Sequence, residues 1–249
     1  MNDQALERYS RHVLLSQLDY DGQQSLMDAK VLILGLGGLG SSAAQYLAGA
    51  GIGSLTLLDP DVVELSNLHR QVVHQEATLN MNKARSAKQQ LEILNSSIRI
   101  EAIDGLLSDE KLSAHMAAVD VVLDCTDNSR SRMLHNRLCV QTATPLVSAA
   151  AIRLEGQLMV VDPREANSPC YQCVYPDLSA QQDTCSTSGI LGPVVGLMGV
   201  MQALEAIKLI AKIGEPTRGK LINFDGLDLS MRTFKVSQNQ NCPVCAENN

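Results

Sequence analysis

The chain lacks a run of basic residues: its 20 lysines and arginines are scattered over 249 residues, and the net charge is −7. Nucleic acid is therefore not expected as a partner, because proteins that bind it cluster their positive charge. Segment 1–12 is polar and lacks the apolar core of a secretory signal. The longest apolar window, 190–204, is short for a membrane span. It predicts a buried helix or a subunit interface and no membrane contact.

Strands and helices alternate along the first part of the chain. A short buried strand at 30–35, a small-residue helix at 39–51 and a second strand at 54–61 form a unit of about 30 residues, typical of a Rossmann-type βαβ unit. The same alternation then predicts strands at 98–103, 117–125 and 144–151 and helices at 4–15, 80–95 and 129–142. We therefore predict an α/β fold with a mostly parallel sheet and helices on both faces.

The pattern changes from about residue 155. A strand at 155–163 is followed by a polar stretch without period, 177–188, which predicts a mobile loop. Beyond the long apolar helix, strands are expected at 220–225 and 231–236. Since no Pro/Gly linker intervenes, we predict one continuous domain, 1–249, with a nucleotide-binding part at about 1–153. A smaller, antiparallel C-terminal region occupies about 154–249.

The stretch VLILGLGGLG joins the first strand to the first helix. Gly35, Gly37 and Gly40 fit the G-x-G-x-x-G pattern, and Gly38 adds a fourth glycine. Such a turn lets phosphate approach the backbone and places it at the positive end of a helix. Asp59, at the end of the next strand, is placed to accept hydrogen bonds from a ribose. These features predict a nucleotide without choosing between NAD and ATP; the alternative is a tight turn of any α/β protein.

Charged residues beyond the second and fourth strands favour a triphosphate. Asn67, Arg70 and Lys83 follow Asp59 and could neutralise outer phosphates, although isolated cations are as often part of a solvated face. Asp127 lies beyond a buried strand, where a carboxylate could hold Mg²⁺. An equally simple interpretation makes it an N-cap or turn residue.

Two C-x-x-C pairs, Cys170 with Cys173 and Cys242 with Cys245, match a tetrahedral Cys₄ zinc site. The 68 residues between the pairs mean that the metal would clip the C-terminus onto a distant loop in a structural role. A redox dithiol or free buried thiols are the alternative. Since no secretory signal accompanies the cysteines, we expect a reducing compartment and a cytoplasmic protein.

The other cysteines differ among themselves. Cys185 lies in the polar stretch, where an exposed thiol could be nucleophilic or simply a spare residue. Cys125 and Cys139 lie on apolar segments and are expected in the core. The five histidines have no metal-ligand spacing and are assigned no chemistry.

The motifs RYSRH, GLGGLG, LLDPDVVELSNLHRQ, LDCTDN, CYQC, DTCSTSGILGPVVG and CPVC, in this order, resemble the ThiF/MoeB/HesA family. These proteins are bacterial relatives of the ubiquitin-activating enzymes, and the resemblance covers nearly the whole chain. It implies an adenylyltransferase that uses ATP and magnesium. Its substrate would be the C-terminal glycine of a small ubiquitin-like sulfur-carrier protein ending in Gly-Gly, of the ThiS or MoaD type.

The resemblance also implies roles for individual residues. Gly38 matches a position that lines the nucleotide, and Asp59 matches the ribose-binding acid. The phosphate-contacting and magnesium-binding positions are matched by Asn67, Arg70, Lys83 and Asp127. The zinc ligands are matched by Cys170, Cys173, Cys242 and Cys245, in the part of the chain that would also bind the carrier.

Two further matches imply partners. Arg11 matches an arginine that family members insert into the ATP site of the partner subunit, which implies a homodimer. Cys185 matches the loop cysteine that can form a thioester or persulfide-derived link to the carrier, a residue whose necessity differs between family branches. No rhodanese domain follows CPVC, so a separate sulfurtransferase is expected to deliver sulfur. The chain departs from the family pattern at His12, His69 and Asn82, which bears on substrate fit more than on the chemistry.

Two other functions stay open from the residues alone. An NAD-dependent oxidoreductase shares the glycine turn but leaves the zinc clip, Arg70 and Lys83 unexplained. A non-catalytic scaffold could bind a ubiquitin-like protein without turnover, although Arg70, Lys83 and Asp127 count against it. Within the family resemblance, the N-terminal segment and the GPVVGLMG helix lean slightly towards the thiamin branch, but the carrier stays undetermined.

Overall fold

A computed structural model describes residues 1–176 and 188–246, so most of the stretch predicted as a mobile loop, including Cys185, lies outside the described residues. The strands are β1 (Lys30–Leu34), β2 (Ser54–Leu58), β3 (Arg99–Ile103), β4 (Val121–Asp124), β5 (Leu146–Ile152), β6 (Glu155–Val161), β7 (Lys220–Asp225) and β8 (Ser230–Lys235). The helices are α1 (Asp3–Arg8), α2 (Ser10–Val13), α3 (Asp19–Asp28), α4 (Gly38–Ala50), α5 (Lys83–Leu94), α6 (Asp109–Ala117), α7 (Ser129–Gln141), α8 (Tyr171–Val174) and α10 (Gly192–Ala211).

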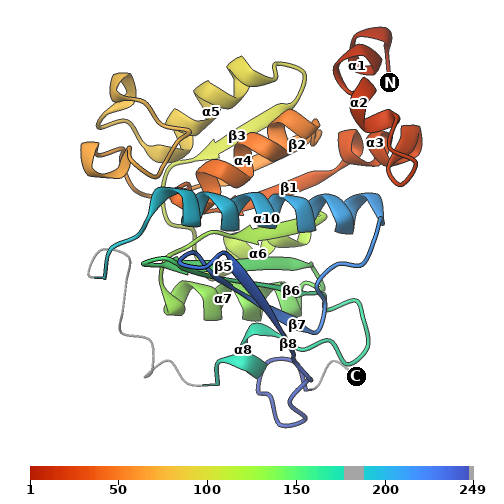
Figure 1. The fold of residues 1–249 in the computed structure, drawn as a ribbon, viewed down its shortest axis with the longest axis vertical. Coiled ribbons are helices and arrows are strands. Elements are labelled where there is room, and N and C mark those ends of the chain that lie inside the picture. Colours follow the sequence, from red (N-terminus) through yellow and green to blue (C-terminus); the bar gives the residue numbers. More distant parts are fainter. Residues whose placement is uncertain (177–187, 247–249) are drawn as a thin grey trace.

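All the strands form one eight-stranded sheet in the order β3-β2-β1-β4-β5-β6-β7-β8 (Figure 1). The first five are parallel, and β6, β7 and β8 continue the same sheet in antiparallel pairing. The predicted C-terminal antiparallel strands are therefore confirmed, as an extension of the parallel sheet. The strand order reverses between β1 and β4, and in open α/β sheets this switch point is where ligands bind, beyond the carboxyl ends of the strands.

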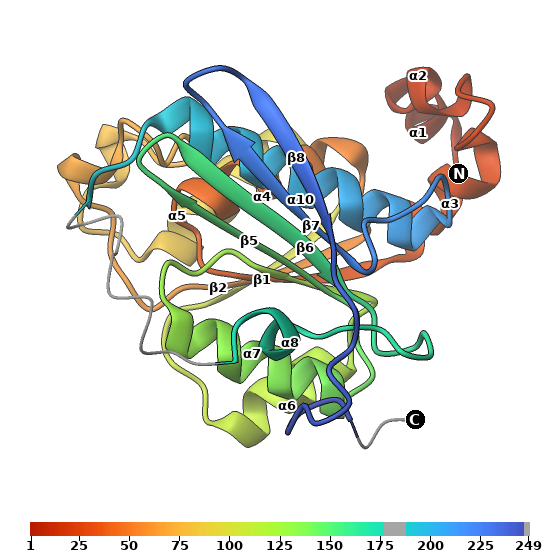
Figure 2. The same cartoon turned by 60° about the horizontal axis from the view of Figure 1, so that its bottom comes forward.

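Helices cover both faces of the sheet, as predicted (Figure 2). Val31 and Ile33 of β1 point into a core shared with α4, α5 and α10, whereas Leu32 and Leu34 point into a second core shared with α6, α7 and α8. Successive residues of a strand face opposite sides, so a strand covered on both sides is apolar throughout. This is why the run in β1 shows no alternation in the sequence.

Two features of the helices and one of the strands differ from the prediction or add to it. The predicted helix at 4–15 is two short helices, α1 and α2, because Tyr9 leaves helical geometry with ψ at 14°. The short helices α3, α6 and α8 were not predicted; Ser108 caps the N-terminus of α6 by accepting from Lys111 N. The predicted strand 54–61 ends at Leu58, which leaves Asp59 in the loop beyond the sheet.

The apolar helix α10 is longer than the apolar window, because it continues through Glu205 and Lys208, which pair at 2.7 Å. Over the ranges 1–176 and 188–246 it is the one helix long and apolar enough to span a bilayer, by length and composition only. Half of that apolar stretch is buried, and the helix packs on α4, β5 and β6. The expectation of a buried helix agrees with this packing.

Candidate active site

The glycine loop connects β1 to α4 in the predicted strand–turn–helix arrangement. Gly35 has φ at +91°, a region that side chains rarely adopt, and a Cβ on Gly40 would overlap the carbonyl oxygen of Gly35. Gly37 is the N-cap of α4 and Gly38 is its first residue. The close passage of loop and helix leaves the first N–H groups of α4 directed beyond the sheet edge, where they can bind an anion.

Asp59 lies one residue beyond β2, with 4% of its surface exposed. Its Oδ2 accepts a hydrogen bond from Leu36 N at 2.6 Å, and its Oδ1 accepts one from Asp61 N at 2.9 Å. Burial raises the pKa of Asp59, while Lys83 and the two backbone donors oppose the rise. A carboxylate can accept more than one bond on each oxygen, so Asp59 is oriented and still able to accept from ribose hydroxyls.

Lys83 is the first residue of α5, is 7% exposed, and places its Nζ 2.9 Å from Asp61 Oδ2. Asn82 caps this helix by accepting from Arg85 N, and its Nδ2 donates to the carbonyl oxygens of Asp59 (2.8 Å) and Asp61 (3.0 Å). One side chain therefore joins the start of α5 to the segment that carries the buried acid. The departure at position 82 is accommodated by a specific set of hydrogen bonds.

Arg70 lies against the glycine loop, since a Cβ on Gly38 would lie 3.3 Å from the Arg70 carbonyl oxygen. Its Nη1 donates to the Ser66 carbonyl at 3.0 Å and lies 2.8 Å from His69 Nε2. Asn67 is buried in the same turn, and its carbonyl accepts from Arg70 N. The structure thus brings Asn67 and Arg70 to the same edge as Asp59 and Lys83.

Asp127 reaches this edge from β4. Cys125 N donates to the Leu34 carbonyl, and a Cβ on Gly35 would lie 2.9 Å from the Cys125 carbonyl oxygen, so the segment after β4 runs beside the glycine loop. Asn128, not Asp127, caps α7 by accepting from an N–H of its first turn at 2.9 Å. Asp127 is exposed, and because Asn128 supplies the cap, the Asp127 carboxylate is available for a ligand.

Arg11 does not lie at this edge of its own chain. It belongs to α2, at the end of the molecule where β1 begins, while the loops that follow β2 lie at the opposite end (Figure 1). Cys185 lies outside the described residues.

The two cysteine pairs come together as predicted. The four Sγ atoms of Cys170, Cys173, Cys242 and Cys245 lie within 4.8 Å of one another, with neighbouring separations of 3.4 to 3.9 Å. A tetrahedron of thiolates about 2.3 Å from a zinc ion has S–S edges of roughly 3.8 Å, so the donor set fits zinc and leaves no open coordination position. Burial raises the pKa of the Cys170 thiol and the neighbouring Asn136 side chain opposes the rise; zinc, when bound, would hold this group as the thiolate.

His74 is a buried contributor that the sequence did not reveal. Its Nε2 lies 2.9 Å from the Leu36 carbonyl oxygen and its Nδ1 lies 2.9 Å from Ser86 Oγ. Burial lowers the pKa of His74 to about 4, so the ring is neutral and Nε2–H donates to Leu36. Both backbone polar groups of Leu36 are thus held by side chains, the N–H by Asp59 and the C=O by His74. His74 has no spacing pattern with Leu36 that a sequence could display.

These groups gather at the switch point of an α/β sheet, the usual place for a nucleotide in proteins of this class, and the four thiols form a separate cluster. The chain belongs to the ThiF family, whose sequence profile matches residues 9–244. It is 44% identical over 247 residues to an Escherichia coli molybdopterin-synthase adenylyltransferase, covering 99% of each chain. It is 46% identical over 249 residues to the E. coli sulfur carrier protein ThiS adenylyltransferase, covering 100% of this chain and 98% of that one.

The fold is also similar to solved structures. The crystal structure of E. coli MccB with ATP superposes with a TM-score of 0.83 at 26% identity, covering 96% of this chain and 74% of that one. The family resemblance inferred from the motifs is confirmed by these comparisons.

Proposed function

We propose that this protein catalyses the ATP- and magnesium-dependent adenylation of the C-terminal glycine of a small ubiquitin-like sulfur-carrier protein. The observation that carries the proposal is the convergence of loop 35–40, Asp59, Arg70, Lys83 and Asp127 at one edge of the sheet. The two adenylyltransferases to which the chain is 44% and 46% identical, over nearly their whole length, support the same reaction.

The chemistry follows from the charges at this edge. The carrier carboxylate attacks the α-phosphorus of ATP, the bond from that phosphorus to the bridging oxygen breaks, and pyrophosphate leaves with its electron pair. Lys83 and Arg70 stabilise the negative charge that builds on the phosphates, and Asp127 would hold Mg²⁺, which neutralises phosphate charge when bound. No side-chain base is required, because a carboxyl group with a pKa near 3.5 is already ionised at pH 7.

Lys83 is prepared for this role before the nucleotide arrives. Its ammonium group is buried beside Asp59 and is paired with Asp61, whose side chain is 67% exposed. Because the Asp61 side chain is largely exposed, it can turn into solvent when phosphate oxygens take its place beside Lys83. The ribose-binding acid, Asp59, stays in place because two backbone N–H groups hold it.

The C-terminal part of the chain, about 154–249, is where we propose that the carrier binds. Paired residues form a row across the sheet on the α7–α8 face: Asp124, Ser148, Met159, Leu221 and Phe234. This row joins the strand that precedes Asp127 to the projecting β7–β8 hairpin (Figure 2). The hairpin exposes Leu227 (80%), Leu229 (77%) and Phe234 (48%), which suits an apolar surface of a partner.

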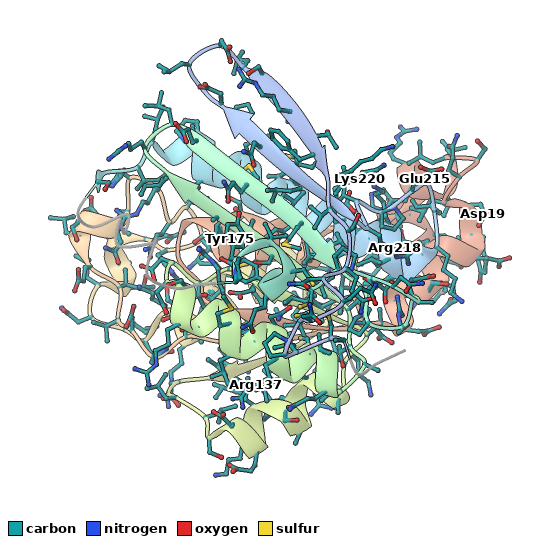
Figure 3. The ribbon with its side chains drawn as sticks, turned by 90° about the horizontal axis from the view of Figure 1, so that it is seen from below. Asp19, Arg137, Tyr175, Glu215, Arg218 and Lys220 are labelled. Atoms are coloured by element: carbon teal, nitrogen blue, oxygen red, sulfur yellow. The ribbon has the colours of Figure 1, made fainter. Side chains whose placement is uncertain are left out.

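A shallow groove follows part of the same row, lined by Ser148, Gln157, Tyr175 and Leu221 among others. Tyr175 lies beside α8 at the centre of Figure 3, and its hydroxyl donates to Gln157 Oε1 at 2.5 Å. Burial raises the pKa of Tyr175 to about 12, so the hydroxyl stays protonated and can donate. We propose that the Gly-Gly tail of the carrier runs along this row, because glycines carry no side chain that would clash with its residues.

Arg11 acts in the active site of a second copy in this proposal. Its position away from its own site supports a homodimer, as do the exposed Leu14 near it (73%) and the exposed Leu65 (67%) and Val72 (56%) beside Arg70. Apolar side chains of this kind on both segments are suited to burial in one interface. We further propose that Cys185 acts after adenylation, with sulfur from a sulfurtransferase, and that the protein is cytoplasmic.

Carrier-dependent exchange of labelled pyrophosphate into ATP tests the proposal. Exchange with a ThiS-type or a MoaD-type carrier, abolished by removing the Gly-Gly tail, is the expected result. No exchange with either carrier, together with tight carrier binding, would indicate a non-catalytic scaffold. Binding of NAD in preference to ATP would instead favour an oxidoreductase.

A further inference from the structure

The segment that leads to Asp127 is held by buried charged side chains. Asp124, the last residue of β4, has no exposed surface, and its Oδ1 accepts from Thr126 N (3.1 Å) and from the Thr126 hydroxyl (2.7 Å). Arg132 of α7 donates from Nη2 to the Thr126 carbonyl oxygen at 2.6 Å. That carbonyl belongs to the peptide bond between Thr126 and Asp127. Both polar groups of Thr126's backbone are therefore fixed by side chains.

His135 completes the cluster. Its Nδ1 lies 3.2 Å from Asp124 Oδ2, and neither of these two buried atoms has a hydrogen-bond partner of good geometry among the described residues; the His135 side chain is 9% exposed. Burial by itself raises the pKa of Asp124, but His135, Arg132 and Thr126 outweigh burial and hold the pKa below its ordinary value. Asp124 is therefore a buried carboxylate beside Arg132 and His135, which are spaced three apart and so lie on the same face of α7.

The opposite side of the segment is fixed as well. Gln202 of α10 donates from Nε2 to the Asp124 carbonyl at 2.8 Å and accepts from the Cys125 thiol at 3.3 Å. Asp127, the next residue beyond this held segment, is exposed and takes no part in the cluster. Side chains of Asp124, Arg132 and Gln202 therefore hold this backbone segment from both sides. The exposed carboxylate of Asp127 follows it, beside the glycine loop.

Buried charges of this kind are costly, and apolar residues of similar volume often stabilise a core better. These buried charged groups hold the backbone segment directly before Asp127, which points to a functional reason for their presence. We infer that Asp124, Arg132 and His135 are positioning residues that set the Asp127 carboxylate for the metal ion bound with ATP. The inference rests on the proposed function, because it takes Asp127 as a ligand of that ion.

The test measures Mn²⁺ bound to the enzyme–ATP complex by electron paramagnetic resonance, without carrier, so a lost carrier contact cannot influence it. Loss of residues that orient a metal ligand typically weakens metal binding about 10–100-fold. Arg132→Met and His135→Leu should therefore weaken Mn²⁺ binding about tenfold, while ATP affinity without metal changes less than about twofold. His135→Asn, which keeps an N–H at the δ position, should restore most of the affinity.

Arg137→Met is the matched control. Arg137 lies on the same helix but on the surface, where it pairs with Asp109 at 2.9 Å (Figure 3). If His135→Leu fails to fold because Asp124 is left unpaired, the double variant Asp124→Asn/His135→Leu removes the charge with its partner and should show the same loss. Asp127→Asn distinguishes a failure of the proposed metal site from a failure of the positioning role. If it leaves Mn²⁺ affinity unchanged, the proposed metal site is wrong. If it weakens binding while folded Arg132→Met does not, only the positioning role is wrong.

Discussion

His74 gives a direct way to test how the glycine loop is held. Its neutral ring donates from Nε2 to the Leu36 carbonyl and lies 2.9 Å from Ser86 Oγ, in a site where burial lowers its pKa from 6.5 to about 4. Between these two values the unfolded chain binds a proton that the folded chain does not. Protonation therefore favours unfolding, and the stability that His74 contributes is lost as the pH falls below about 6.5.

The size of the effect follows from the shift. At about pH 5 the unfolded side chain is almost fully protonated and the folded one almost fully neutral, which corresponds to a loss of about 2 kcal/mol relative to neutral pH. His74→Gln keeps an N–H donor at the ε position and removes the titration. The variant should lose about 2 kcal/mol less than the wild type when the pH is lowered from about 7.5 to about 5.

Urea unfolding at a series of pH values measures this difference, because carboxylates that titrate over the same range contribute equally to both proteins. His115→Gln, on α6 at the other face of the sheet, is the control and should leave the pH dependence of the wild type in place. Parallel stability profiles for the wild type and His74→Gln would refute the buried, neutral assignment of His74.

Four further predictions concern the site. Arg70→Ala and Lys83→Ala should each lower pyrophosphate exchange by roughly 10²–10³, the usual effect of losing one preorganised charge, and unchanged rates in both would mean that neither residue stabilises the phosphates. One zinc ion per chain should be found by elemental analysis, and Cys242→Ser should lose both the metal and much of the stability, since zinc binding to thiolates contributes on the order of 10 kcal/mol. Mixed dimers of Arg11→Ala and Lys83→Ala chains should recover activity if each active site takes Arg11 from the partner copy; no recovery would mean that Arg11 acts in its own chain or not at all. Cys185→Ser should keep pyrophosphate exchange and lose a covalent enzyme–carrier species in non-reducing mass spectrometry, and full thiocarboxylate formation by the variant would make Cys185 a bystander.

Much of the architecture was predictable because it depends on residue patterns that are local in the sequence. The apolar run before Gly35, the small-residue helix after it and Asp59 lie within a single βαβ unit, where neighbours in sequence are neighbours in space. Patterns failed where the stabilising contacts are distant or the element is short. Tyr9 interrupts the predicted N-terminal helix, and its hydroxyl accepts from Asn95, 86 residues away, which no local periodicity records.

The sequence by itself predicted the class of site: a glycine turn of the phosphate-binding type, an acid placed for a ribose, and two thiol pairs spaced for one metal ion. Each depends on residue types at fixed short spacings, and such spacings can be recognised in the sequence alone. Only the tertiary structure decided that the antiparallel strands extend the parallel sheet, that His74 holds Leu36, and that Arg132 and His135 meet Asp124. The residue type of a buried polar group does not indicate which residue will be its partner. A buried charge is stable wherever the fold places a matching group beside it, and that placement depends on the tertiary structure.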